Sequence, residues 1–107
     1  MKQKNRRVVC ADGFNMSVQA DKNSYCSPRT DEGPYLSVEV GFPSAYDFYL
    51  IEYAEDRNQP TETVYGWVPI RQVRLCIDAH GGWAEGELPP FDTEATGLEW
   101  PDPLPAQ

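Results

Sequence analysis

The sequence has no long apolar run and few of the side chains that usually carry catalysis. No apolar stretch approaches the ~20 residues of a membrane-spanning helix, and the basic N-terminus is not followed by an apolar signal-like segment. Glycine-rich phosphate loops are missing, and His80 is the only histidine in 107 residues. We therefore expect a cytoplasmic protein that is not an enzyme and has no membrane partner.

Basic residues are scarce beyond position 7. The sequence has seventeen acidic and nine basic residues, and four of the basic ones lie within the first seven positions. From Val8 onward, five basic residues face seventeen acidic ones, a net charge of −12. Such a body repels nucleic acids and anionic membranes and attracts basic protein surfaces. We expect a protein partner with a basic surface and no direct binding of nucleic acid.

The three cysteines are an odd number in a chain without a secretory signal, so we expect reduced, buried thiols. The alternative is that the cysteines bind zinc. Cys76 and His80 are four residues apart, as two ligands on one helix face would be, and Cys10 and Cys26 could complete a tetrahedral site. Structural zinc ligands usually come in close pairs, however, and Cys10 and Cys26 are sixteen positions apart. We therefore expect no metal and no cofactor.

A Cys76–His80 nucleophile pair is also disfavoured. A thiol in mid-helix that faces the core has no access to a substrate and no electropositive surroundings to lower its pKa. His80 is instead expected to bind the free carbonyls at the helix end in its cationic form.

Alternation of apolar and polar residues predicts strands over 6–11, 14–20 and 35–42 and a short strand over 64–68. Asp12-Gly13 between the first two runs is a strong hairpin signal, because both residues tolerate the positive φ of a tight turn. We expect the segments 6–11, 14–20 and 35–42 to form a small antiparallel sheet.

The clearest helix is predicted over 69–80. Pro69 is favourable at a helix start and Gly81-Gly82 at a helix end. Helical spacing places Ile70, Val73 and Ile77 on one face, which should cover the sheet. The sequence thus predicts an α+β fold, with a single domain over 1–83.

The segment 44–54 has two interpretations. Ser44 followed by Asp47 resembles a capping box, and a helix would align Tyr46, Tyr49, Leu50 and Tyr53 on one face. The run 48–51 is also rich in residues that favour strands, and periodicity does not separate the two over so short a stretch. We predict a short second helix here.

The remaining residues, 84–107, are predicted to be an acidic, proline-rich C-terminal tail. Alone, such a composition buries too little apolar surface to become ordered. Trp83, Phe91, Leu98 and Trp100 are nevertheless large apolar residues for a disordered segment. We expect something to hold the tail, either its own domain or another chain.

Acidic residues and tyrosines alternate in the loop 21–34 and the segment 44–63. Tyrosine is enriched at binding hot spots, and rim carboxylates steer basic partners. The sequence predicts a partner-binding surface made of Asp31, Glu32, Tyr35, Asp47, Tyr49, Glu52, Tyr53, Glu55, Asp56 and Glu62.

Three runs carry a loose resemblance to known proteins: Cys10 to Ala20, Tyr25 to Arg29, and Val38 to Ser44. These runs resemble small uncharacterised accessory proteins encoded by bacteriophages and prophages, over about two thirds of the chain. The resemblance includes no catalytic motif. What it implies is a context in which short acidic proteins inhibit host defence enzymes, as anti-CRISPR proteins do, some as mimics of DNA.

The leading hypothesis is therefore a non-catalytic acidic inhibitor that occupies a basic, nucleic-acid-binding surface of a host protein. A structural or adaptor protein of virion assembly is the second hypothesis, with the tail as a docking arm. A small zinc-binding module is the third.

Overall fold

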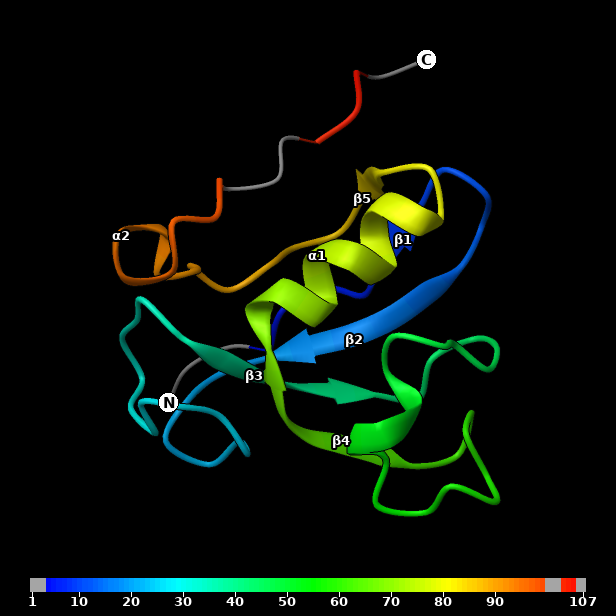
Figure 1. Cartoon of the computed structure of the whole chain (residues 1–107), viewed down its shortest axis with the longest axis horizontal. Helices are drawn as coiled ribbons and strands as arrows, with labels where there is room; N and C mark the ends of the chain where they lie inside the picture. Colours follow the sequence, from blue (N-terminus) through cyan, green and yellow to red (C-terminus); the bar gives the residue numbers. More distant parts are fainter. Residues whose placement is uncertain (1–3, 100–102, 106–107) are drawn as a thin grey trace.

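The computed structural model describes residues 4–99 and 103–105, which form an antiparallel five-stranded sheet with a helix across one face (Figure 1). The strands lie side by side in the order β4-β3-β2-β1-β5. The predicted α+β fold with one main helix is confirmed. In chain order the elements are β1 (Val8–Cys10), β2 (Asn15–Gln19), β3 (Ser37–Gly41), the 3-10 helix η1 (Ile51–Tyr53), β4 (Val64–Pro69), α1 (Ile70–Ala79), β5 (Trp83–Glu85) and α2 (Thr93–Thr96).

β1 and β2 form the predicted hairpin around Asp12-Gly13. Gly13 has a φ of +95°, which glycine adopts without a steric penalty. The amide of Cys10 donates to the Phe14 carbonyl at 2.8 Å, and the Phe14 amide donates to Oδ1 of Asp12 at 2.9 Å. Because Oδ1 stabilises the turn, Oδ2 of Asp12 is left for a partner elsewhere in the fold.

α1 begins directly after Pro69 and ends before Gly81-Gly82, as predicted. Its apolar face is buried, including the predicted anchors Ile70, Val73 and Ile77. The facing core residues alternate along the central strands and are Met16, Val18, Val38 and Val40. No helix in the described residues combines the length and the apolar character that a membrane span requires.

The predicted helix over 44–54 is wrong for most of its length, since only η1 is helical there. The residues expected to cap it bind other parts of the fold. The Ser44 hydroxyl accepts from the Asn15 amide at 3.0 Å, and Oδ1 of Asp47 accepts from the Tyr49 amide at 2.9 Å. A turn around Asp47 replaces the first helical turn, so Leu50 enters the core while Tyr46 stays exposed.

The domain itself holds the described part of the predicted tail. β5 pairs with β1, and Phe91 is buried in the core. Around Phe91, the Tyr35 amide donates to the Pro90 carbonyl and the Asp92 amide donates to the Tyr35 carbonyl, each at 2.8 Å. Further along, the Leu104 amide donates to the Trp83 carbonyl at 2.7 Å. Trp100 lies outside the described residues.

Gly86 allows the chain leaving β5 to pass directly against the chain entering β1. A Cβ at Gly86 would lie 1.9 Å from the carbonyl oxygen of Arg7 and 2.8 Å from the Cα of Val8. Both of these atoms belong to the backbone and cannot turn aside. Gly86 also has a φ of +93°, where side-chain-bearing residues are strained. The pairing of β5 with β1 therefore requires glycine at this position.

We expect Gly86→Ala to destabilise the fold by more than about 3 kcal/mol, because the new methyl group displaces the β1 backbone. Gly97→Ala is the matched control, since Gly97 also has a positive φ but nothing lies within 4 Å of its would-be Cβ. The free energy of unfolding of the control should fall by only about 1 kcal/mol. Urea unfolding of both variants tests this, and equal losses would show that the close contact with Arg7 is not a constraint.

Candidate functional site

His80, directly after α1, lies between two carboxylates. Its Nδ1 is 2.6 Å from Oδ2 of Asp12, and its Nε2 is 2.8 Å from Oδ2 of Asp47. An ionised carboxylate only accepts hydrogen bonds, so both ring nitrogens donate and the side chain is an imidazolium. The expected cationic form of His80 fits this geometry. The prediction that His80 binds the free carbonyls at the helix end is wrong, because its side chain binds the two aspartates instead.

The surroundings of His80 fix the ring in place. The Phe14 ring stacks on the imidazole with centroids 4.0 Å apart and planes 8° from parallel. Burial of His80 favours the neutral ring, but the hydrogen bonds and charges of Asp12 and Asp47 outweigh it and raise the pKa of His80. The Phe14 amide, and after it His80, lowers the pKa of Asp12. Cationic His80 between two ionised carboxylates is thus the stable form of this site.

Cys76 lies one helical turn before His80 and is fully buried. Its sulfur lies within 4.8 Å of the ligand atoms of Asp47 and His80, and Oδ2 of Asp47 accepts a hydrogen bond from Nε2 of His80. Burial, and then the charge of Asp47, raises the pKa of Cys76, which leaves the thiol protonated at neutral pH. Burial, and then Asp12, likewise raises the pKa of Cys10 to about 11. We call Asp12, Asp47, Cys76 and His80 the His80 cluster.

The structure does not bring together the three cysteines and one histidine of the alternative zinc site. Cys26 donates to the carbonyls of Asp21 and Pro28 in the loop 21–34. Among the described residues, the group with ligand atoms within 4.8 Å of one another is Asp47, Cys76 and His80. Asp47 was not predicted as a neighbour of Cys76 and His80, because nothing in the sequence indicates that the turn at Asp47 folds against the end of α1.

The predicted partner-binding residues divide into three groups. Tyr35 and Asp47 are buried, so neither side chain lies on the surface of this structure. Tyr49 and Tyr53 are half-buried and pack against the core. The exposed residues are the six carboxylates Asp31, Glu32, Glu52, Glu55, Asp56 and Glu62.

The six exposed carboxylates lie at opposite ends of β3. The loop with Asp31 and Glu32 is held at its beginning, where the Ser27 amide donates to the Ser37 carbonyl. The other four lie beyond its end, where the Phe42 amide donates to the Thr63 carbonyl at 3.0 Å. Figure 1 shows the loops of 42–63 on the side of the sheet away from α2. The structure therefore divides the predicted surface in two.

Three exposed aromatic residues lie in the same segment as the second group, and two of them, Phe42 and Phe48, were not predicted from the sequence. Phe42, Tyr46 and Phe48 are 50%, 58% and 76% exposed. Thr63 connects this segment to the acids, because its carbonyl binds Phe42 and its hydroxyl accepts from the Asp56 amide at 3.2 Å. We call Phe42, Tyr46, Phe48, Glu52, Glu55, Asp56 and Glu62 the acidic–aromatic surface.

Phe42 is held in a strained backbone conformation. Its φ is +48°, which is rare for a residue with a large side chain. Its amide binds Thr63, and its carbonyl accepts from the Arg7 guanidinium at 2.6 Å. Strain of this kind persists only where the surroundings impose it, and it is concentrated at functional sites. This positive φ could not be predicted from the sequence, because a phenylalanine at the end of an alternating strand is usually a core residue.

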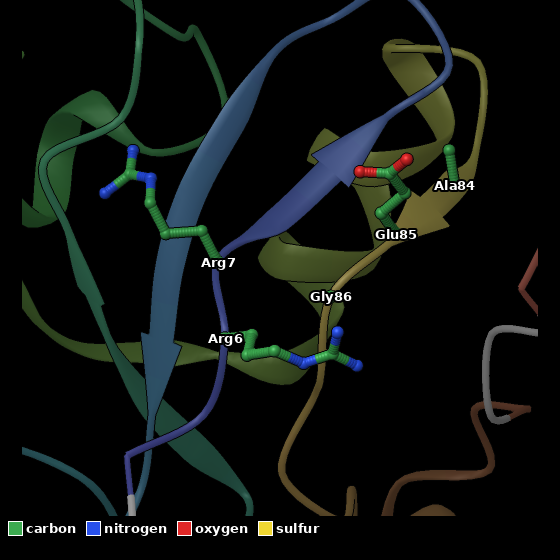
Figure 2. Close-up of a pocket in the computed structure, with 5 residues that line it drawn as sticks. All are labelled: Arg6, Arg7, Ala84, Glu85 and Gly86. Atoms are coloured by element: carbon green, nitrogen blue, oxygen red, sulfur yellow. The ribbon is translucent and has the colours of Figure 1, made fainter.

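A surface hollow lies between the chain entering β1 and β5, lined by Arg6, Arg7, Ala84, Glu85 and Gly86 (Figure 2). The charged groups do not converge there. The Arg7 guanidinium points away from Glu85 and binds Asn15 and Phe42, while Arg6 binds Glu87. The hollow therefore holds no set of side chains arranged around a common substrate.

Comparison with protein-family models, curated proteins and solved structures finds no match to this chain. Its function must therefore be argued from its own side chains.

We expect the stability that the His80 cluster contributes to depend on pH. The folded pKa of His80 is above its ordinary value of 6.5, so this contribution is complete below that value and is lost as the pH rises through the folded pKa. His80→Gln removes the cation and leaves the charge of buried Asp47 uncompensated. The free energy of unfolding should therefore fall by about 3 kcal/mol at mildly acidic pH.

Urea unfolding of wild type and His80→Gln in metal-free buffer, from about pH 5 to about pH 9, measures this difference. The free energies of unfolding should converge as the pH rises. A difference that stays constant over the range would contradict the assignment of a cationic His80.

Proposed function

We propose that this chain is a non-catalytic binding protein whose acidic–aromatic surface occupies a basic, nucleic-acid-binding surface of another protein. The observation that carries the proposal is the combination of three exposed aromatic rings with four exposed carboxylates over one segment, 42–62. Soluble proteins do not need aromatic rings at such exposure for folding, and aromatic side chains are enriched in the centres of protein interfaces.

The charge of this segment supports a basic partner. Between residues 42 and 63, Arg57 is the only basic residue, and its guanidinium donates to the Glu52 carbonyl. Asp47 is paired with His80, so the four carboxylates of the acidic–aromatic surface determine its charge. A surface of this sign repels phosphates and attracts the Lys and Arg side chains that bind them. It therefore competes for the same proteins that nucleic acids bind.

The chemistry of the only histidine supports binding over catalysis. Both nitrogens of His80 donate to carboxylates, so neither is available as a general base. The thiols of Cys10 and Cys76 are buried and protonated. The resemblance to phage accessory proteins adds a biological context for this proposal: an inhibitor of a host nucleic-acid-binding or defence protein, acting in the host cytoplasm.

Reversing three acids tests the charge of the surface. The tagged chain is used to capture host proteins, each captured protein is purified, and its nucleic acid is offered as a competitor. We expect Glu52→Lys, Glu55→Lys and Asp56→Lys together to slow association by about tenfold at low salt and to flatten its salt dependence, because rim charges act on encounter.

Glu85→Lys, Glu94→Lys and Glu99→Lys form the matched control, since they change the net charge equally but are exposed around β5 and α2. The control should retain fast association. If both triple variants behave alike, or if nucleic acid and the chain bind the captured protein together, the proposal fails. Self-association of the chain without capture would favour an assembly protein.

Truncating the exposed rings tests the source of affinity. Phe48→Ala or Tyr46→Ala should speed dissociation from the captured protein by a factor equivalent to about 2 kcal/mol, since desolvated aromatic anchors act mainly on dissociation. Leu36→Ala is the control, because Leu36 is 45% exposed but lies beside the beginning of β3. Unchanged dissociation rates for both ring variants would place the interface elsewhere.

A further inference from the structure

The His80 cluster combines three kinds of metal ligand at one buried position. A carboxylate oxygen of Asp47, the sulfur of Cys76 and an imidazole nitrogen of His80 lie within 4.8 Å of one another. Asp47 and Cys76 are buried, and His80 is partly exposed. In a tetrahedral zinc site the donor atoms are roughly 3.5 Å apart, so side-chain movements of about 1 Å would bring these three around one ion.

We propose that Asp47, Cys76 and His80 form a binding site for one divalent transition-metal ion of the zinc type. The donor set indicates the class of ion, because a sulfur and an imidazole nitrogen beside one carboxylate suit zinc, whereas calcium and magnesium prefer oxygen ligands alone. Three protein ligands leave a fourth position for water. This inference is independent of the proposed function.

Asp12 occupies the position of a supporting carboxylate. Its Oδ2 lies 2.6 Å from Nδ1 of His80, on the opposite side of the ring from Asp47. Metal-bound histidines usually donate their second N–H to such a carboxylate, which fixes the tautomer and makes the other nitrogen a better ligand. Asp12 is thus a positioning residue, and it leaves Nε2 facing Asp47 and Cys76.

The exchange of protons for metal is balanced. Without metal, the Cys76 sulfur carries one proton, and Nε2 of His80 carries another, which it donates in a hydrogen bond to Asp47. When a divalent ion binds, these two protons pass to the solvent, and bonds form from the ion to the sulfur, to Nε2 and to a carboxylate oxygen. Counting Asp12, the cluster has a net charge of −1 in both states. No oxidation or reduction is involved.

Titration of the reduced, chelator-treated full chain with Zn²⁺ and Co²⁺ tests the site. We expect one equivalent of Zn²⁺ to bind with release of two protons, measured with a pH indicator. Co²⁺ should give the absorption of a tetrahedral site together with a sulfur-to-cobalt charge-transfer band, which reports directly on Cys76. The wild-type measurement needs no variant, so a folding defect cannot obscure it.

Cys76→Ser and Asp47→Asn should abolish the bands, while Asp12→Asn should weaken affinity about tenfold to a hundredfold and leave the charge-transfer band in place. Cys26→Ser is the matched control, because Cys26 is also buried but binds carbonyls in the loop 21–34. Cobalt binding without a charge-transfer band, a band that survives Cys76→Ser, or equal loss in Cys26→Ser would each overturn the proposal.

Discussion

The contact on which the rest of the structure depends is the imidazolium of His80 between Asp12 and Asp47. These three residues come from the end of α1, the β1–β2 hairpin turn and the turn that follows Phe42. Two charge-assisted hydrogen bonds therefore connect segments 33 and 68 positions apart in the sequence. Asp47 is only 6% exposed, so without His80 its carboxylate would be buried with its charge uncompensated.

This connection also explains why aromatic rings are exposed in the neighbouring segment. Because the Asp47 side chain turns inward to His80, the residues on either side of it, Tyr46 and Phe48, are directed outward. Leu50 then returns to the core. The same interaction that closes the domain at the end of α1 thus supports the part of the surface that we assign to binding. Rigid support of this kind lowers the entropy that an interface loses on association.

The second constraint is the close contact of Arg7 with the backbone at two positions, Gly86 and Phe42. Gly86 lies against the Arg7 carbonyl, and Phe42 is held at positive φ between Arg7 and Thr63. Arg7 takes part in both, through its backbone on one side and its guanidinium on the other. Arg7 is therefore part of the framework of the sheet, although in the sequence it is one of a group of basic residues typical of a surface.

The sequence by itself determined the local structure. Asp12-Gly13 specified the hairpin, period-two alternation specified β2 and β3, and Pro69 with Gly81-Gly82 delimited α1, because each of these signals acts on neighbouring residues or on one face of one element. Only the tertiary structure decided which side chains meet. The capping pattern at Ser44 and Asp47 was indistinguishable from a helix start until Asn15 and His80 were available as competing partners. For the same reason Tyr35 appeared to be a surface residue: its buried environment depends on Phe91, 56 positions away, and on backbone pairing that leaves no pattern in the sequence.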